Sequence, residues 1–284
     1  MRRTLLVLLL GPLAWLHADA ARAGVPAGEL LDRLAAYVIT FQRDFSQVIG
    51  TEHYTQVSHD LSWSTRTRQM QSDVFFVGTG DDSGAMTVRN VRRVDGRSVP
   101  DASLGIDQAL ALPPSRRLER LKALADLGAR YNLGSLQRNF NDPTLPLMLA
   151  ALIQQSRFRY TIEGTELLAG IDTTRLAFRE TTRPTVIRGR DGANVPASGR
   201  LWVDENGTVW RTEFRATTYD RPTRVEASAV IRVTYRRDDK LGIMVPDRMD
   251  EDYRYGDAQR IMFVGGHATY DGYRRFETSA RVLP

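Results

Sequence analysis

The sequence contains no cysteine and very little lysine or histidine, and each shortage excludes a class of chemistry. Without cysteine there is no disulfide, no thiolate nucleophile and no acylated cysteine to anchor a lipoprotein. Lysine occurs only at positions 122 and 240, so arginine carries nearly all the positive charge of a chain whose net charge is +5. Acidic residues are interspersed among these arginines, which disfavours nucleic-acid binding. Stability must therefore come from apolar burial and backbone hydrogen bonds.

The sequence motifs of common enzyme sites are missing as well. After the amino-terminal leader the histidines are His53, His59 and His267, and their spacing matches no common metal site. No Gly-x-Ser-x-Gly elbow occurs. The densest acidic group is Asp-Glu-Asp at 250 to 252, which together with Glu52 could resemble the carboxylate pair of a glycosidase. Strand alternation splits this group, because it turns the middle residue away from the other two. We interpret this group as a solvated strand, and we predict no catalytic residue, no metal site and no cofactor.

The first 23 residues have the pattern of a secretory signal peptide. Arg2 and Arg3 precede an apolar run from Leu5 to Leu16, and small-residue patterns at 18–20 and 21–23 offer cleavage points. The run is shorter than the ~20 residues of a membrane-spanning helix. We therefore predict cleavage near residues 20 to 23, export to the periplasm of a Gram-negative bacterium, and no transmembrane segment in the mature chain.

The sequence pattern of the mature chain predicts a helix, several strands, a helical insert and a longer series of strands. Apolar residues recur every three or four positions from Ala27 to Val48, which predicts an amphipathic helix. The insert, at about 103 to 155, contains a helix from Pro113-Pro114 to Arg130 and an almost wholly apolar segment near 145 to 154 that we expect to be buried. Strands are predicted near 51–57, 70–78, 86–94, 157–162, 174–181, 199–204, 208–217, 224–236, 247–255 and 260–278.

A predicted hairpin with the turn sequence DENG carries a tryptophan on each strand. A two-residue type I′ turn pairs Val203 with Trp210. A type I turn that begins at Asp204 and closes with a left-handed Gly207 makes Trp202 face Trp210, and its preferred residues favour it. Both registers leave apolar side chains on both faces. The sheet therefore needs cover on both sides, or a hollow on one.

The hairpin sequence GRLWVDENGTVWRTEFRAT, at 199 to 217, resembles that of periplasmic lipoprotein carriers of the LolA kind and of the related sigma-factor regulator RseB. This resemblance implies an α+β fold, in which a curved antiparallel β-sheet forms a half-barrel with an N-terminal helix and a helical insert packed on it. It also implies a hydrophobic hollow that takes acyl chains. Three other stretches, ARYNLG at 129–134, NDPTLPLML at 141–149 and GHATYDGYRRF at 266–276, are similar to a family of exported bacterial proteins without an assigned activity.

The sequence and these resemblances lead to two main hypotheses for residues 24 to 284, which we expect to form one LolA-like domain. The first is a non-enzymatic periplasmic carrier of an apolar or lipid-like ligand. The alternative is an envelope module that senses or binds a protein partner without transporting a ligand. An unrecognised enzyme is a third. For the carrier, aromatic side chains are predicted to line the hollow: Phe158, Tyr160, Phe178, Trp202, Trp210 and Phe214.

Overall fold

The computed structural model describes residues 26–59, 64–78, 85–100, 103–134, 141–189, 192–220, 225–256 and 261–275. The predicted signal peptide lies outside these residues. The elements in chain order are α1 (Ala27–Phe45), β1 (Val48–His59), β2 (Thr65–Gly78), β3 (Ala85–Val94), β4 (Arg97–Ser98), α2 (Ser103–Leu110), α3 (Pro114–Ala129), α4 (Leu145–Leu149), α5 (Leu152–Gln155), β5 (Phe158–Leu168), β6 (Ile171–Glu180), β7 (Ile187–Arg188), β8 (Asn194–Val195), β9 (Ala197–Val203), β10 (Val209–Asp220), β11 (Val225–Arg237), β12 (Met244–Gly256) and β13 (Ile261–Arg275).

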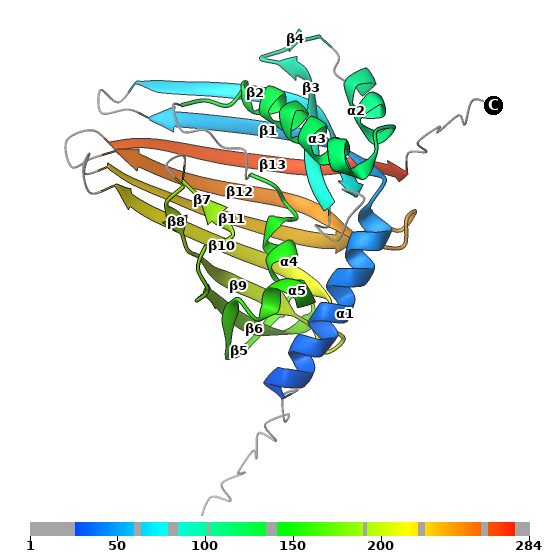
Figure 1. Cartoon of the computed structure of the whole chain (residues 1–284), viewed down its shortest axis with the longest axis vertical. Coiled ribbons are helices and arrows are strands. Elements are labelled where there is room, and N and C mark those ends of the chain that lie inside the picture. Colours follow the sequence, from blue (N-terminus) through cyan, green and yellow to red (C-terminus); the bar gives the residue numbers. More distant parts are fainter. Residues whose placement is uncertain are drawn as a thin grey trace, which may run out of the picture.

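Eleven of the described strands form one antiparallel sheet in the order β4-β3-β2-β1-β13-β12-β11-β10-β9-β6-β5. The last strand, β13, pairs with β1 in the middle of the sheet, while β4 and β5 lie at the two edges. The sheet is therefore open, as Figure 1 also shows, with the helices packed against it. The predicted α+β half-barrel is confirmed. Strands β7 and β8 form a separate two-stranded ribbon that the sequence pattern did not predict.

Helix α1 covers one face of the sheet with its apolar stripe, and we call this the inner face. The buried residues of the helix are Leu30, Leu34, Ala35, Val38, Phe41 and Phe45. The helix ends three residues before the predicted end, because Gln47 adopts a positive φ of 73° and Val48 already pairs with Phe76 of β2. Phe45 packs on Phe76 with ring centroids 4.2 Å apart, which fixes the end of the helix against the sheet.

The insert supplies four helices that cover the sheet in two places. A cluster with α2 and α3 buries Ile49, Phe75, Val77 and Val88, which alternate along their strands with residues of the main core. The apolar segment near 145 to 154 forms two short helices instead of one, because Ala151 has an extended backbone with ψ 145°. In the described part of the chain no helix is long and apolar enough to span a bilayer.

Candidate functional site

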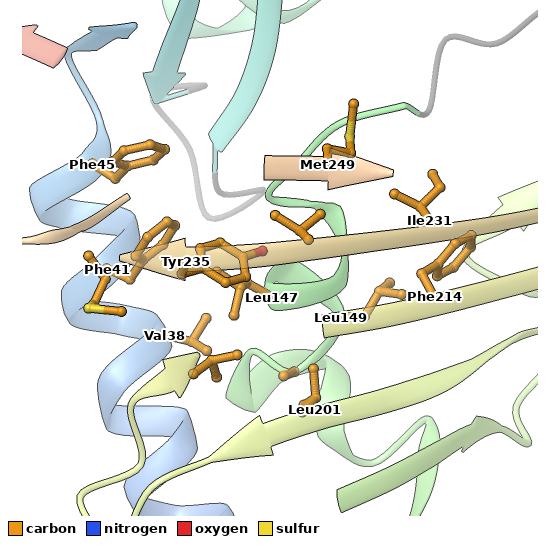
Figure 2. Close-up of a cluster of buried hydrophobic side chains, with 14 of the residues drawn as sticks. Val38, Phe41, Phe45, Leu147, Leu149, Leu201, Phe214, Ile231, Tyr235 and Met249 are labelled. Carbon is orange, nitrogen blue, oxygen red and sulfur yellow. The ribbon is translucent and has the colours of Figure 1, made fainter. Parts of the chain in front are cut away.

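One half of the inner face, which we call the apolar half, is lined almost entirely by hydrocarbon side chains. It comprises Leu176 of β6, Leu201 and Val203 of β9, Phe214 of β10, and Ile231 and Val233 of β11. These six residues are fully buried. Figure 2 shows Leu147 and Leu149 of α4 in the same cluster as Val38 of α1 and Phe214 of the sheet. The two leucines, together with Ala150 and Ala151, are the buried insert residues of this core cluster.

Five of the six aromatic residues predicted to line a hollow come together on the inner face. Phe158, Phe178 and Phe214 belong to the main core, and Tyr160 and Trp210 are partly buried against it. Phe158 contacts Phe178 edge to face, with ring centroids 5.8 Å apart. These residues now form a packed cluster beneath the helices. That they contact a ligand stays a prediction.

The hairpin turn is the favoured one, but the register beyond it differs from both predictions. Gly207 has a φ of 86° and donates its N–H to the Asp204 carbonyl at 3.1 Å, as in a type I turn closed by a left-handed glycine. Val203 accordingly pairs with Val209. A β-bulge then inserts Trp210, whose indole N–H donates to the Asp204 carboxylate at 3.0 Å.

Because of this bulge Trp202 pairs with Arg211, and the predicted meeting of Trp202 and Trp210 does not occur. Trp202 lies between two inner-face residues of β9 and therefore points to the outer face. Its ring lies under the guanidinium of Arg211, with 4.6 Å from Cζ to the ring centroid, and its indole N–H donates to Glu166 at 2.7 Å. Trp202 is thus the one predicted lining residue that does not reach the inner face.

The other half of the inner face, which we call the polar half, contains an ion pair buried from water. Glu52 of β1 is fully buried and accepts hydrogen bonds from Arg89 of β3 at 2.7 and 2.9 Å. The Arg89 guanidinium also donates to the side-chain oxygen and the carbonyl of Asn141, at 3.1 and 2.7 Å. Tyr270 donates to Glu52 at 2.9 Å, and burial together with the Glu52 charge holds the pKa of Tyr270 well above its ordinary value of 10.0.

A second buried carboxylate, Glu251 of β12, lies near this pair. It accepts hydrogen bonds from Tyr54 and Tyr253, the latter at 2.9 Å. Gly266 of β13 allows this arrangement, because a Cβ there would lie 2.5 Å from the Glu251 carboxylate and 2.8 Å from the Tyr54 hydroxyl. The polar half therefore holds two carboxylates and one guanidinium in fixed geometry.

Side chains of the inner face fix both described ends of the segment that joins α3 to α4. Gln56 of β1 accepts the N–H of Leu133 at 2.8 Å and donates to the Asn132 side chain at 3.0 Å. At the other end, Tyr235 donates to the carbonyl of Pro143 at 2.6 Å. Together with the contacts of Arg89, these bonds fix the described residues at both ends of the segment, as far as Pro143, two residues before α4.

Sequence reasoning missed the polar half, although it weighed two of its members. The alternation predicted for residues 250 to 252 is correct, since Glu251 faces inward while Asp250 and Asp252 pair with outer-face partners. The interpretation of the whole group as a solvated strand is wrong, because Glu251 is buried. The available signal was the presence of Tyr54, Tyr253 and Tyr270 on the inward side of their strands, because they supply the donors that a buried carboxylate requires. Among the described residues no three His, Asp or Glu side chains gather closely enough to hold a metal ion.

No protein-family model and no curated protein matches this sequence. Solved structures that are similar to this chain include the following three. They are a domain from Vibrio parahaemolyticus described as an outer membrane lipoprotein-sorting protein (10% identity, 87% of this chain and 92% of that chain, TM-score 0.36), a LolA superfamily protein from Nitrosomonas europaea (15%, 92% and 96%, 0.29), and MucB in its complex with MucA from Pseudomonas aeruginosa (11%, 86% and 99%, 0.20). The solved structures similar to this chain thus include proteins of the kinds that the hairpin sequence resembles. At these identities and TM-scores they assign neither a family nor an activity to this chain.

Proposed function

We propose that this protein is a periplasmic carrier whose apolar half binds the acyl chains of a lipid-like ligand in the place of α4. The observation that carries the proposal is the way in which this half is covered. A continuous apolar lining from β6 to β11 meets a helix of only five residues, through Leu147 and Leu149. Hydrocarbon chains could replace these leucines without leaving a polar group unsatisfied.

The polar contacts of this segment support its movement as a unit. Tyr235 and Arg89 fix the chain just before α4. From there to α5 the contacts with α1 include two hydrogen bonds, from Gln42 to the Met148 sulfur at 3.0 Å and from Gln155 to the Leu31 carbonyl at 3.1 Å. Neutral bonds of this kind contribute ~1 kcal/mol each. Residues 145 to 155 can therefore leave the sheet while the anchored part of the insert stays in place.

The energies of the exchange indicate the kind of ligand. Withdrawing Leu147 and Leu149, together with the other buried residues of the segment, Pro146, Ala150 and Ala151, costs at least about 5 kcal/mol. Burying a chain of about twelve methylenes gains ~10 kcal/mol at ~0.8 kcal/mol each. The surplus of at most ~5 kcal/mol does not exceed the lower estimates of the entropy lost on association. A single acyl chain should consequently bind weakly, and a ligand with two or three chains should bind tightly.

Because the native sequence contains no cysteine, two introduced cysteines can be cross-linked selectively. In a Gln42→Cys, Met148→Cys variant, a short reducible dithiol-reactive linker would tie α4 to α1, whose side chains meet at these positions. We expect the linked protein to lose uptake of a fluorescent fatty acid and to regain it on reduction. The Gln42→Cys single variant, treated in the same way, is the control.

Protein purified from a bacterial envelope should also release acyl lipid on organic extraction, as detected by mass spectrometry. Equal uptake by the linked and reduced forms would exclude displacement of α4. If, in addition, no lipid copurifies with the protein, the carrier proposal as a whole is wrong.

A further inference from the structure

The outer face of the sheet contains a shallow trough of ≈ 450 Å³ that lies across β1, β13, β12 and β11. The strand register explains why it exists. Val57, Gly265, Asp252 and Val230 lie on one row across these four strands, and the next row begins with His59, Phe263 and Arg254. Gly265 has no side chain, and its row carries two valines where the surrounding outer face carries charges. The trough therefore has Gly265 at its floor and apolar groups of Val57, Val230 and Phe263 in its lining, together with His59, Ser228, Asp252 and Arg254.

Two of the trough residues are unusual for the outer face of a sheet. Phe263 is 46% exposed, although it lies in the interior of the sheet between β1 and β12. The guanidinium of Arg254 lies over its ring, with 5.6 Å from Cζ to the centroid. A large exposed aromatic residue beside an apolar depression is typical of a binding surface.

In the part of the chain that the structure describes, Arg254 is a cation of the trough without a carboxylate partner. Asp252 is paired with Arg232 at 2.8 Å, and His59 contacts the hydroxyl of Thr65. Over the described ranges Arg254 makes no ion pair and contacts only the Phe263 ring. A ligand that fits must therefore present an apolar group to Gly265 and a negative charge to Arg254.

We propose that this trough is a docking site for an extended acidic segment of a partner protein, with an apolar side chain over Gly265 and a neighbouring carboxylate on Arg254. The site goes beyond the carrier function, since it lies on the opposite face of the sheet. A peptide fits better than a membrane surface, because the trough is bordered by ion pairs such as Arg232 with Asp252 and Arg248 with Asp250. Hydrocarbon covering these charges would have to desolvate them, whereas a peptide can leave them in water.

The test compares three fluorescein-labelled heptapeptides, each with a central leucine flanked on both sides by glutamate, glutamine or lysine. Fluorescence anisotropy should show the tightest binding for the glutamate peptide, and Arg254→Glu should transfer the preference to the lysine peptide. One exposed ion pair changes affinity up to about fivefold, so the charge effect should have that size and should weaken with salt. Arg179→Gln, an exposed arginine of β6 away from the trough, is the charge control.

A second variant tests the apolar contact without threatening the fold. A Cβ at Gly265 would have only the Glu251 carbonyl within reach, at 4.0 Å, so Gly265→Val fills the trough and leaves the sheet intact. Burial of one leucine side chain changes affinity by more than about tenfold, so we expect all three peptides to bind at least ten times more weakly.

Unchanged binding to Gly265→Val would overturn the site. So would equal affinity for the three peptides, or no binding of any of them at millimolar concentration. Fatty-acid uptake through the inner face should be unaffected by either variant, which separates this inference from the carrier proposal.

Discussion

From β9 to β11 the inner face is built mainly from aliphatic side chains, with Thr212, Phe214 and Tyr235 among them. From β12 to β3 it buries two carboxylates, a guanidinium and the tyrosines that donate to those carboxylates. The apolar half is held by contacts that have no direction, so any hydrocarbon of similar volume satisfies it. The polar half is held by hydrogen bonds that only one arrangement of partners completes. One sheet thus combines a part whose contents can be exchanged with a part whose geometry is fixed.

The largest expected effect comes from removing the cation of the polar half. Arg89→Met leaves Glu52 buried and charged without its partner, so the free energy of unfolding at pH 7 should fall by about 3 to 5 kcal/mol. An uncompensated buried charge is costly only while the group is ionised. The penalty should therefore be smaller under acidic conditions than at pH 7.

Urea denaturation of both proteins at pH 7.0 and 4.5 measures this difference. We expect the difference in unfolding free energy between wild type and Arg89→Met to be smaller at pH 4.5 than at pH 7.0. The double variant Glu52→Gln, Arg89→Met should be less destabilised than Arg89→Met at pH 7. An equal gap at both values of pH would show that lost packing, and not an uncompensated charge, explains the loss.

A matched substitution in the apolar half should lower the free energy of unfolding by almost as much, and this loss should not depend on pH. Phe214 is fully buried under α4, and Phe214→Ala should lower the free energy of unfolding by about 3 to 4 kcal/mol through lost burial and a residual cavity. Urea denaturation at pH 7.0 and at pH 4.5 should give the same loss of unfolding free energy for this variant. A loss well below 2 kcal/mol would indicate that α4 moves into the space, which would itself support the mobility of that helix.

The same contrast explains how much could be predicted from the sequence. The apolar periodicity of α1 and the alternation along β11 follow from burial alone, and both elements occur where the pattern placed them. The turn at Asp204 and Gly207 was also predictable, because a left-handed position favours glycine. These features depend only on residues close together in the chain.

Other features depend on partners far away in the sequence. The bulge at Trp210 reversed the expected position of Trp202, and it is fixed by the Asp204 carboxylate and by contact of the turn with α1, since a Cβ at Gly207 would lie 2.5 Å from Arg33 of that helix. Glu52 meets Arg89 and Tyr270 across 37 and 218 residues of chain. No local pattern indicates such pairs, so the polar half emerged only from the structure.

The smallest of these effects comes from two adjacent glycines that face opposite sides of β13. At Gly266 a methyl group would lie 2.5 Å from the Glu251 carboxylate and 2.8 Å from the Tyr54 hydroxyl, whereas at Gly265 it would meet only the Glu251 carbonyl, at 4.0 Å. Gly266→Ala should therefore cost about 1 to 3 kcal/mol by forcing the buried hydrogen bonds apart, and Gly265→Ala should be neutral or slightly stabilising. Thermal unfolding of the two variants measures the difference directly. Equal melting temperatures would mean that the Tyr54 and Glu251 side chains shift freely, and the polar half would then lack the fixed geometry that separates it from the apolar half.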